Sequence, residues 1–283
     1  MVKFNELKRP YLIAEIGINH NGDIQIAKKL IDSTFACSWD CAKFQKRNPD
    51  ICVPEDQKNV KRSTPWGEMT YLGYKRRIEF GKKEYDYIDK YCREKPLDWA
   101  LSVWDIDSLK FALNYELPFI KIPSAHLTND ELLKAAALTK IPVILSTGMS
   151  TLEEIDKAVE VLKEHASQYV LMHCNSSYPA KMEELNLKMI PKLKDRYGCV
   201  VGYSGHEYGL DSTTIAVSLG AMVVERHITL DHTMWGTDHS SSVEVQGMDK
   251  LFKQINSVGK ILGDGESRVY ESERSVRIKL RGY

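Results

Sequence analysis

The sequence lacks the features that mark several large classes of protein. Its 283 residues contain 39 Lys plus Arg and 39 Asp plus Glu, so the formal net charge is zero. A protein that binds nucleic acid through the phosphate backbone normally carries an excess of Lys and Arg. There is no run of eighteen apolar residues that could span a membrane and no signal peptide at the start. We therefore expect a cytoplasmic protein without nucleic-acid or membrane partners.

Paired cysteines and flexible linkers are also scarce. Of the six cysteines only Cys37 and Cys41 are close together, and no second pair is available to complete a zinc site. We expect reduced, buried thiols. No low-complexity or Pro/Gly/Ser-rich segment divides the chain, which predicts a single domain over residues 1–283.

What the sequence does contain is a regular alternation of short apolar runs and amphipathic segments. Helical periodicity separates the runs, and Thr151 with Glu154 resembles a capping box. The segment 49–66 shows little periodicity and is expected to be an extended loop. Eight strand-like runs can be recognised, at residues 11–18, 41–44, 99–103, 119–122, 143–146, 169–173, 200–203 and 222–227.

Eight strand–helix repeats predict an α/β fold, a (β/α)₈ TIM barrel. The alternative is an open doubly wound sheet. The barrel is favoured because the count is eight and no Gly-x-Gly-x-x-Gly motif follows the first run.

Every apolar run ends in polar residues, and the carboxyl ends of barrel strands carry the active site. Lys43 and Lys121 lie within runs, where burial of an unpaired ammonium is costly. They are expected to bind a phosphate or carboxylate, or else to pair with a buried carboxylate such as Glu15. Ser124, Ser146 and Thr147 would add neutral donors to the same anion.

Two histidines follow adjacent strands near the end of the chain. His206 and His227 could bind a divalent metal together, with Glu15 or water completing the shell. Asp238 follows in a Gly-containing loop, and Tyr178 and Trp235 also lie in loops at the mouth.

These residues belong to an ordered set of motifs that covers nearly the whole chain. The set resembles that of the sialic acid synthase family, which includes N-acetylneuraminate, legionaminate and pseudaminate synthases. The motifs are EIGINHNG at 15–22, KFQ at 43–45, KIPS at 121–124, LSTGM at 145–149, HCNSSYP at 173–179, GYSGH at 202–206, ERH at 225–227 and GTDH at 236–239.

The resemblance implies a metal-dependent transferase that condenses phosphoenolpyruvate with an open-chain sugar aldehyde such as N-acetylmannosamine. His206 and His227 would hold Mn²⁺ or Mg²⁺, and Glu15 would be the acid/base or water-positioning carboxylate. A homodimer is also implied. Around phosphoenolpyruvate the resemblance places Lys43, Lys121, Ser124, Ser146, Ser176 and Ser204, with Ser102 as a weaker contact; around the sugar it places Gln45, Tyr178 and Asp238.

Two departures from the family pattern concern the acceptor sugar. Where members usually carry a carboxylate two residues after the serine of the lysine–serine motif, this chain has His126. The C-terminal antifreeze-like domain of many members is expected to be absent. The acceptor is therefore expected to differ from N-acetylmannosamine, or another chain supplies the missing contacts.

Two other functions fit the same residues. A Schiff-base aldolase would use Lys43 or Lys121 to attack a 2-keto acid such as pyruvate. A degenerate barrel would serve as a non-catalytic scaffold, although a scaffold has no need to keep two lysines and two histidines at costly positions.

Overall fold

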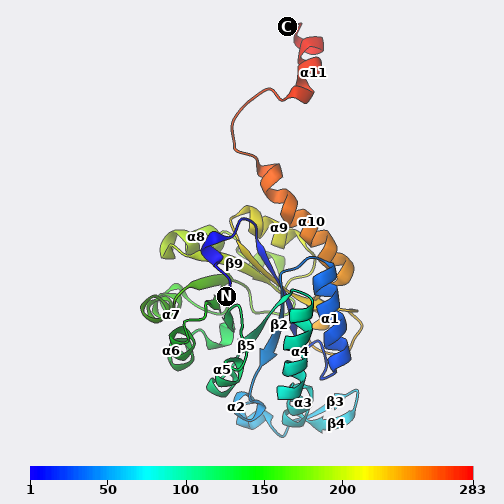
Figure 1. Ribbon diagram of the computed structural model, residues 1–283, viewed down its shortest axis with the longest axis vertical. Helices are drawn as coiled ribbons and strands as arrows, with labels where there is room; N and C mark the ends of the chain where they lie inside the picture. Colours follow the sequence, from blue (N-terminus) through cyan, green and yellow to red (C-terminus); the bar gives the residue numbers. More distant parts are fainter. Residues whose placement is uncertain (283) are drawn as a thin grey trace.

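The computed structural model describes residues 1–282 and contains a closed barrel of parallel strands surrounded by helices (Figure 1). Each strand pairs with the next along the barrel, and the last pairs with the first. The prediction of a (β/α)₈ barrel is confirmed, and all eight expected runs are strands. In barrel order they are β1 (Tyr11–Gly17), β2 (Cys41–Lys46), β5 (Asp98–Val103), β6 (Ile120–Ile122), β7 (Val143–Ser146), β8 (Tyr169–His173), β9 (Val200–Gly205) and β10 (Val223–Thr229).

The strands are nearly continuous apolar runs because both of their faces are buried, as is usual in parallel sheets. All seven residues of β1 are buried. Outward-facing side chains pack under the helices in one large core. A second core closes the amino-terminal end of the barrel, where Phe4 meets Tyr11 and Phe119 edge to face. With this end filled, the polar residues gather at the opposite end.

The helices begin and end where the sequence signals indicate. In α7 the hydroxyl of Thr151 caps the helix and Glu154 completes the predicted capping box, while Ile155 and Leu162 are buried against the barrel. The covering helices are α1 (Ile24–Ala36), α4 (Lys82–Glu94), α5 (Ile106–Ala112), α6 (Asp130–Leu138), α7 (Leu152–His165), α8 (Met189–Tyr197), α9 (Asp211–Ser218) and α10 (Val245–Leu262).

The segment 49–66 is not the extended loop that the sequence predicted. It contains α2 (Pro49–Cys52), the 3-10 turn η2 (Glu55–Gln57) and β3 (Lys61–Thr64), which pairs antiparallel with β4 (Gly67–Thr70). α3 (Tyr71–Ile78) follows. The hairpin is largely exposed on both faces and therefore lacks the apolar alternation by which strands are recognised. It lies with α2 and α3 at one edge of the molecule (Figure 1).

The remaining elements are short or peripheral. They are η1 (Phe4–Glu6), η3 (Ser124–His126), η4 (Met182–Glu184), η5 (His239–Ser241), β11 (Val243–Glu244) and α11 (Glu271–Arg281). α11 extends away from the barrel beyond α10 and is exposed along its length (Figure 1). Within residues 1–282 no helix is both long and apolar enough to cross a bilayer.

Candidate active site

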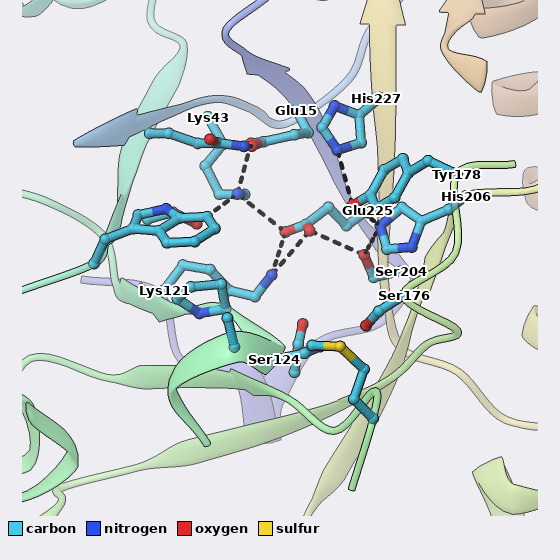
Figure 2. A pocket seen from close by; sticks show the side chains of 17 residues that line it. Glu15, Lys43, Lys121, Ser124, Ser176, Tyr178, Ser204, His206, Glu225 and His227 are labelled. Atoms are coloured by element: carbon cyan, nitrogen blue, oxygen red, sulfur yellow. Dashed lines mark hydrogen bonds and ion pairs between the residues drawn. The ribbon is translucent and has the colours of Figure 1, made fainter. Parts of the chain in front are cut away.

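A cavity of about 170 Å³ opens at the carboxyl ends of the barrel strands (Figure 2). Twelve of the fourteen residues that the sequence placed in the site line it. Asp238 and Thr147 are not part of the lining, and the Thr147 hydroxyl instead donates to the carbonyl of Met172 at 3.2 Å. The lining comprises Glu15, Lys43, Gln45, Ser102, Trp104, Lys121, Pro123, Ser124, Ala125, Ser146, Met149, Ser176, Tyr178, Ser204, His206, Glu225 and His227.

The register between neighbouring strands places several of these residues side by side, at the same height along the barrel axis. Glu15 on β1 lies beside Lys43 on β2 and, on its other side, beside His227 on β10. On the opposite part of the ring Ser102 of β5 pairs with Lys121 of β6. Residues far apart in the chain thus become neighbours because the ring is closed.

A buried ion network forms the floor of the cavity (Figure 2). The ammonium of Lys43 lies 2.5 Å from Glu15 Oε2 and 3.5 Å from Glu225 Oε2, and it donates to Ser102 Oγ at 2.9 Å. Lys121 donates to both oxygens of Glu225, at 2.8 and 3.0 Å. All four charged side chains are at most 6% exposed. Lys43 pairs with Glu15 and Lys121 with Glu225, which is the alternative that the sequence left open beside the expected binding of an anion.

The two lysines differ in their proton affinity. Burial lowers the pKa of Lys43, but Glu15 and Glu225 act against it and the net effect is a raised pKa. For Lys121, burial lowers the pKa more than the carboxylate of Glu225 raises it. Repulsion from Lys43 lowers the pKa further, so the net effect is a lowered pKa. The pKa of Glu225 is held well below its usual range, because Lys121 and Lys43 more than offset its burial. Glu225 is thus an anion shared by two cations.

Hydroxyl groups form the wall next to Lys121. Ser124 Oγ accepts a hydrogen bond from the backbone N–H of Gly148 at 3.2 Å, and Ser204 donates to Glu225 at 3.0 Å. A Cβ at Gly148 would lie 2.9 Å from Ser124 Oγ and also collide with Ser176. Only glycine therefore leaves room at this point, as expected where a backbone N–H approaches a bound anion.

Two imidazoles and one phenol occupy the other wall. The hydroxyl of Tyr178 lies 2.8 Å from His206 Nε2 and 3.5 Å from His227 Nε2. His206 Nδ1 donates to the carbonyl of Asn175 at 2.5 Å, which leaves Nε2 as the acceptor. Burial and the nearby His227 lower the pKa of His206 to about 4, so this ring is neutral at pH 7. Its Nε2 lone pair is then available to a ligand.

The pair of imidazoles fits a divalent metal with few protein ligands. Both Nε2 atoms face the single point that the Tyr178 oxygen now occupies. His227 Nδ1 is buried without a hydrogen-bond partner and lies 3.9 Å from Asp238 Oδ2. Among residues 1–282 no cluster of three or more His, Cys, Asp or Glu side chains has the arrangement of a metal site. Substrate or water oxygens would have to complete the coordination sphere.

Glu15 is held from two sides. Gln45 donates to Glu15 Oε1 at 2.9 Å, while Lys43 contacts Oε2. At Gly17, two residues further along β1, φ is +55° and a Cβ would lie 3.2 Å from Glu15 Oε1. The carboxylate is therefore fixed in orientation at the point where β1 changes register against β2.

Comparison with known proteins identifies the family. Residues 30–267 match the model of the NeuB family. This chain belongs to the NeuB family. It is 39% identical to an N-acetylneuraminate-9-phosphate synthase of Drosophila melanogaster over 253 residues, covering 87% of this chain and 67% of the relative.

Other members of the NeuB family cover still more of the chain. It is 35% identical over 273 residues to an N,N'-diacetyllegionaminic acid synthase of Campylobacter jejuni, covering 95% of this chain and 82% of that one. The crystal structure of the N-acetylneuraminic acid (sialic acid) synthetase of Leptospira borgpetersenii in complex with citrate superimposes with a TM-score of 0.86 at 30% identity. That match covers 99% of this chain and 97% of the other.

Five further residues line this NeuB family site, and two of them, Glu225 and Trp104, have side chains that can interact with a polar ligand. Glu225 was seen only as part of a polar strand end, although a carboxylate inside an apolar run carries the same cost of burial as the two lysines. Trp104 follows the strand-like run at residues 99–103, and nothing in its position in the sequence distinguishes it from other tryptophans. His126 meets the Trp104 ring edge to face at the rim, with centroids 5.4 Å apart.

Proposed function

We propose that this NeuB family protein condenses phosphoenolpyruvate with an open-chain sugar aldehyde, giving a 2-keto-3-deoxy sugar acid and phosphate. The observation that carries the proposal is the convergence of two buried lysines, a wall of serines and two imidazoles on one cavity. The named relatives are synthases of sialic and legionaminic acids, which agrees with this reaction.

Phosphoenolpyruvate matches one half of the cavity. Its phosphate and carboxylate are anions, and ammonium groups with hydroxyl and backbone N–H donors suit both. Lys121, Ser124 and the N–H of Gly148 would receive one of them, and Lys43 with Ser102 the other. Because Lys43, Lys121, Glu15 and Glu225 balance to zero charge, a divalent cation at the imidazoles would help to hold such an anion.

The sugar aldehyde would enter between Tyr178, Gln45 and the imidazoles. His206 and His227 would hold Mn²⁺ or Mg²⁺, which when bound would act as a Lewis acid toward the aldehyde oxygen. The methylene carbon of phosphoenolpyruvate attacks the aldehyde carbon, and water then adds to C2. Glu15, fixed by Gln45 and Lys43, accepts the proton of that water. Glu15 passes this proton to the alkoxide that the aldehyde has become, which gives the new hydroxyl group. The C–O bond between C2 and the bridging oxygen then breaks, the hydroxyl on C2 becomes the keto group, and its proton leaves with the phosphate on the side of the serine wall.

The test is phosphate release from phosphoenolpyruvate in the presence of Mn²⁺ and a panel of aldoses, run in H₂¹⁸O. We expect aldose-dependent release of phosphate that contains no solvent oxygen, because the C–O bond breaks. Solvent ¹⁸O in the phosphate, or release that ignores the aldose, contradicts the proposal.

A Schiff-base aldolase is distinguished by borohydride. Lys121 has the lowered pKa that such a nucleophile needs, but Glu225 holds its ammonium through hydrogen bonds to both carboxylate oxygens. We expect no covalent adduct with pyruvate and borohydride. Trapping of Lys121, together with chelator-insensitive turnover, would establish the aldolase instead.

A further inference from the structure

A buried ion pair lies behind the two strands that carry the imidazoles of the active site. The side chains of Arg226 and Glu207 are 1% and 0% exposed, and Arg226 Nη1 lies 3.0 Å from Glu207 Oε1. Arg226 directly precedes His227 on β10, and Glu207 directly follows His206, just beyond the end of β9. The Arg226–Glu207 pair therefore connects the chain next to one imidazole with the chain next to the other.

Strand alternation explains why this pair faces away from the cavity. Successive side chains of a strand point to opposite faces, and Glu225 and His227 both point into the cavity (Figure 2). Arg226, between them, points outward and reaches α9, where its Nη1 lies 2.8 Å from Thr213 Oγ1. The pair thus lies between the barrel wall and the helix that covers it.

The carboxylate of Glu207 is held by neutral donors as well as by the guanidinium. Tyr203 on β9 donates its hydroxyl to Glu207 Oε2 at 2.8 Å, and Ser212 on α9 donates to Oε1. Arg226 Nη2 also donates to the backbone carbonyl of Glu207 at 2.6 Å. A Cβ at Gly205 would lie 2.8 and 2.9 Å from the two carboxylate oxygens, so glycine at this position leaves the space that the carboxylate fills. The pair is therefore fixed to β9, β10 and α9 at once.

The two imidazoles differ in how far their own hydrogen bonds orient them. A histidine that holds a metal usually donates its second ring nitrogen to a carboxylate or a carbonyl, which fixes the ring. His206 has such a partner, since its Nδ1 donates to the carbonyl of Asn175. His227 Nδ1 is buried without a hydrogen-bond partner and lies 3.9 Å from Asp238 Oδ2. The position of the His227 ring thus depends on the backbone of β10, which Arg226 holds.

A metal held by two imidazoles tolerates little error in their separation. Bonds from zinc to imidazole nitrogen are about 2.1 Å long, so two such nitrogens on one ion lie no more than about 4 Å apart. The rings of His206 and His227 have centroids 5.7 Å apart. A site of this kind must be held to within about 0.5 Å by the residues that support it.

We infer that Arg226 and Glu207 are positioning residues, which together fix the separation of the His206 and His227 imidazoles and thereby set the affinity of the site for a divalent cation. The inference rests on the proposed function, in which these imidazoles hold the metal. Neither Arg226 nor Glu207 lines the cavity, so they act through the two strands. Loss of such supporting partners usually weakens metal binding by about ten- to a hundredfold.

The test measures binding of Mn²⁺ alone to the whole chain, from the electron paramagnetic resonance signal of free Mn²⁺, together with urea unfolding. In Glu207→Gln and in Arg226→Met we expect Mn²⁺ binding to weaken by about tenfold or more. The urea midpoint should also fall, because each substitution leaves a buried charge without its partner. In the double variant Glu207→Gln/Arg226→Met no charge is left unpaired. Its urea midpoint should therefore rise above that of either single variant, whereas Mn²⁺ binding should stay weak.

A pair of tyrosine substitutions tests the same inference without removing a charge. Tyr203→Phe deletes the hydroxyl that donates to Glu207 and should weaken Mn²⁺ binding by about threefold, as expected for one hydrogen bond. Tyr197→Phe is the matched control. Its hydroxyl donates to Asp156 at 2.8 Å, between α8 and α7, and the variant should bind Mn²⁺ as the wild type does.

The outcomes separate the positioning role from the proposed function. Wild-type affinity for Mn²⁺ in either charge variant, or recovery of affinity together with stability in the double variant, overturns the positioning role. Should the charge variants fail to fold, the tyrosine pair decides, and equal binding by Tyr203→Phe and Tyr197→Phe overturns it. A wild-type chain that binds Mn²⁺ no more tightly than His206→Gln would instead remove the metal from the proposed function, and the positioning role with it.

Discussion

Glu225 accepts hydrogen bonds from Lys121 through both carboxylate oxygens while its Oε2 also lies 3.5 Å from Lys43. One side chain on β10 therefore neutralises cations that come from β2 and β6 across the barrel. Its loss would leave two buried ammonium groups with only Glu15 between them.

Glu225→Gln is expected to destabilise the ligand-free protein by about 3 kcal/mol, because removal of one partner from a buried ion pair leaves an uncompensated charge. Urea unfolding measures the change. Glu183→Gln on the exposed turn η4 is the control and should stay within about 0.5 kcal/mol of the wild type. A Glu225→Gln protein as stable as the control would show that the lysines do not depend on Glu225.

Glu15→Gln should retain phosphoenolpyruvate binding and lose at least about a hundredfold in kcat, because the amide cannot take the proton of the attacking water. Calorimetric titration gives the binding and phosphate release gives the turnover. Near wild-type kcat in this variant would remove Glu15 from the catalytic step.

Gly148→Ala should raise the KM for phosphoenolpyruvate more than tenfold, since the added methyl group occupies the space between Ser124 and Ser176. The control is Gly259→Ala in α10, where a Cβ meets nothing. That substitution should leave KM unchanged and stabilise the protein by up to about 1 kcal/mol through helix propensity. An unchanged KM in Gly148→Ala would mean that the anion does not approach this backbone.

Stability of the metal-free protein should fall as the pH is lowered from about 6.5 to about 4. Burial and His227 lower the pKa of His206 to about 4 in the folded state, whereas it is near 6.5 in the unfolded chain. The unfolded state then binds more protons in this window, so unfolding becomes easier, by up to about 3 kcal/mol from this residue.

The measurement for His206 is the free energy of unfolding at several pH values between 4 and 7. In His206→Gln the free energy of unfolding should depend less steeply on pH, because glutamine does not titrate. The decrease in slope should correspond to at most one proton fewer taken up on unfolding. Parallel curves for the variant and the wild type would refute a neutral His206 in the folded protein.

Much of this architecture could be predicted from the sequence because parallel strands buried on both faces are apolar along their length. The strand that begins at Tyr11 shows this, since even its Glu15 is surrounded by Leu, Ile and Ala. The β3–β4 hairpin could not be found in this way, because its residues face solvent and its pairing is local. The cavity of about 620 Å³ that Arg62 of this hairpin lines together with Trp235 was therefore also hidden.

The candidate site was predictable to the extent that strand ends converge in a barrel. That rule brought Lys43, Lys121, His206 and His227 together without knowledge of side-chain geometry. It could not say which carboxylate would balance Lys121, because pairing depends on strand register across the ring. Asp238 shows the same limit, since it faces His227 from outside the lining of the cavity.

The pairing of the first barrel strand with the last has a consequence for biosynthesis. Glu15 and His227 are adjacent only after β10 has docked against β1, so a nascent chain that still lacks its final strands has no assembled site. The site can therefore be active only when the ring of strands is closed. A chain break or deletion that detaches β10 from β1 would abolish turnover even where the other helices and strands still form.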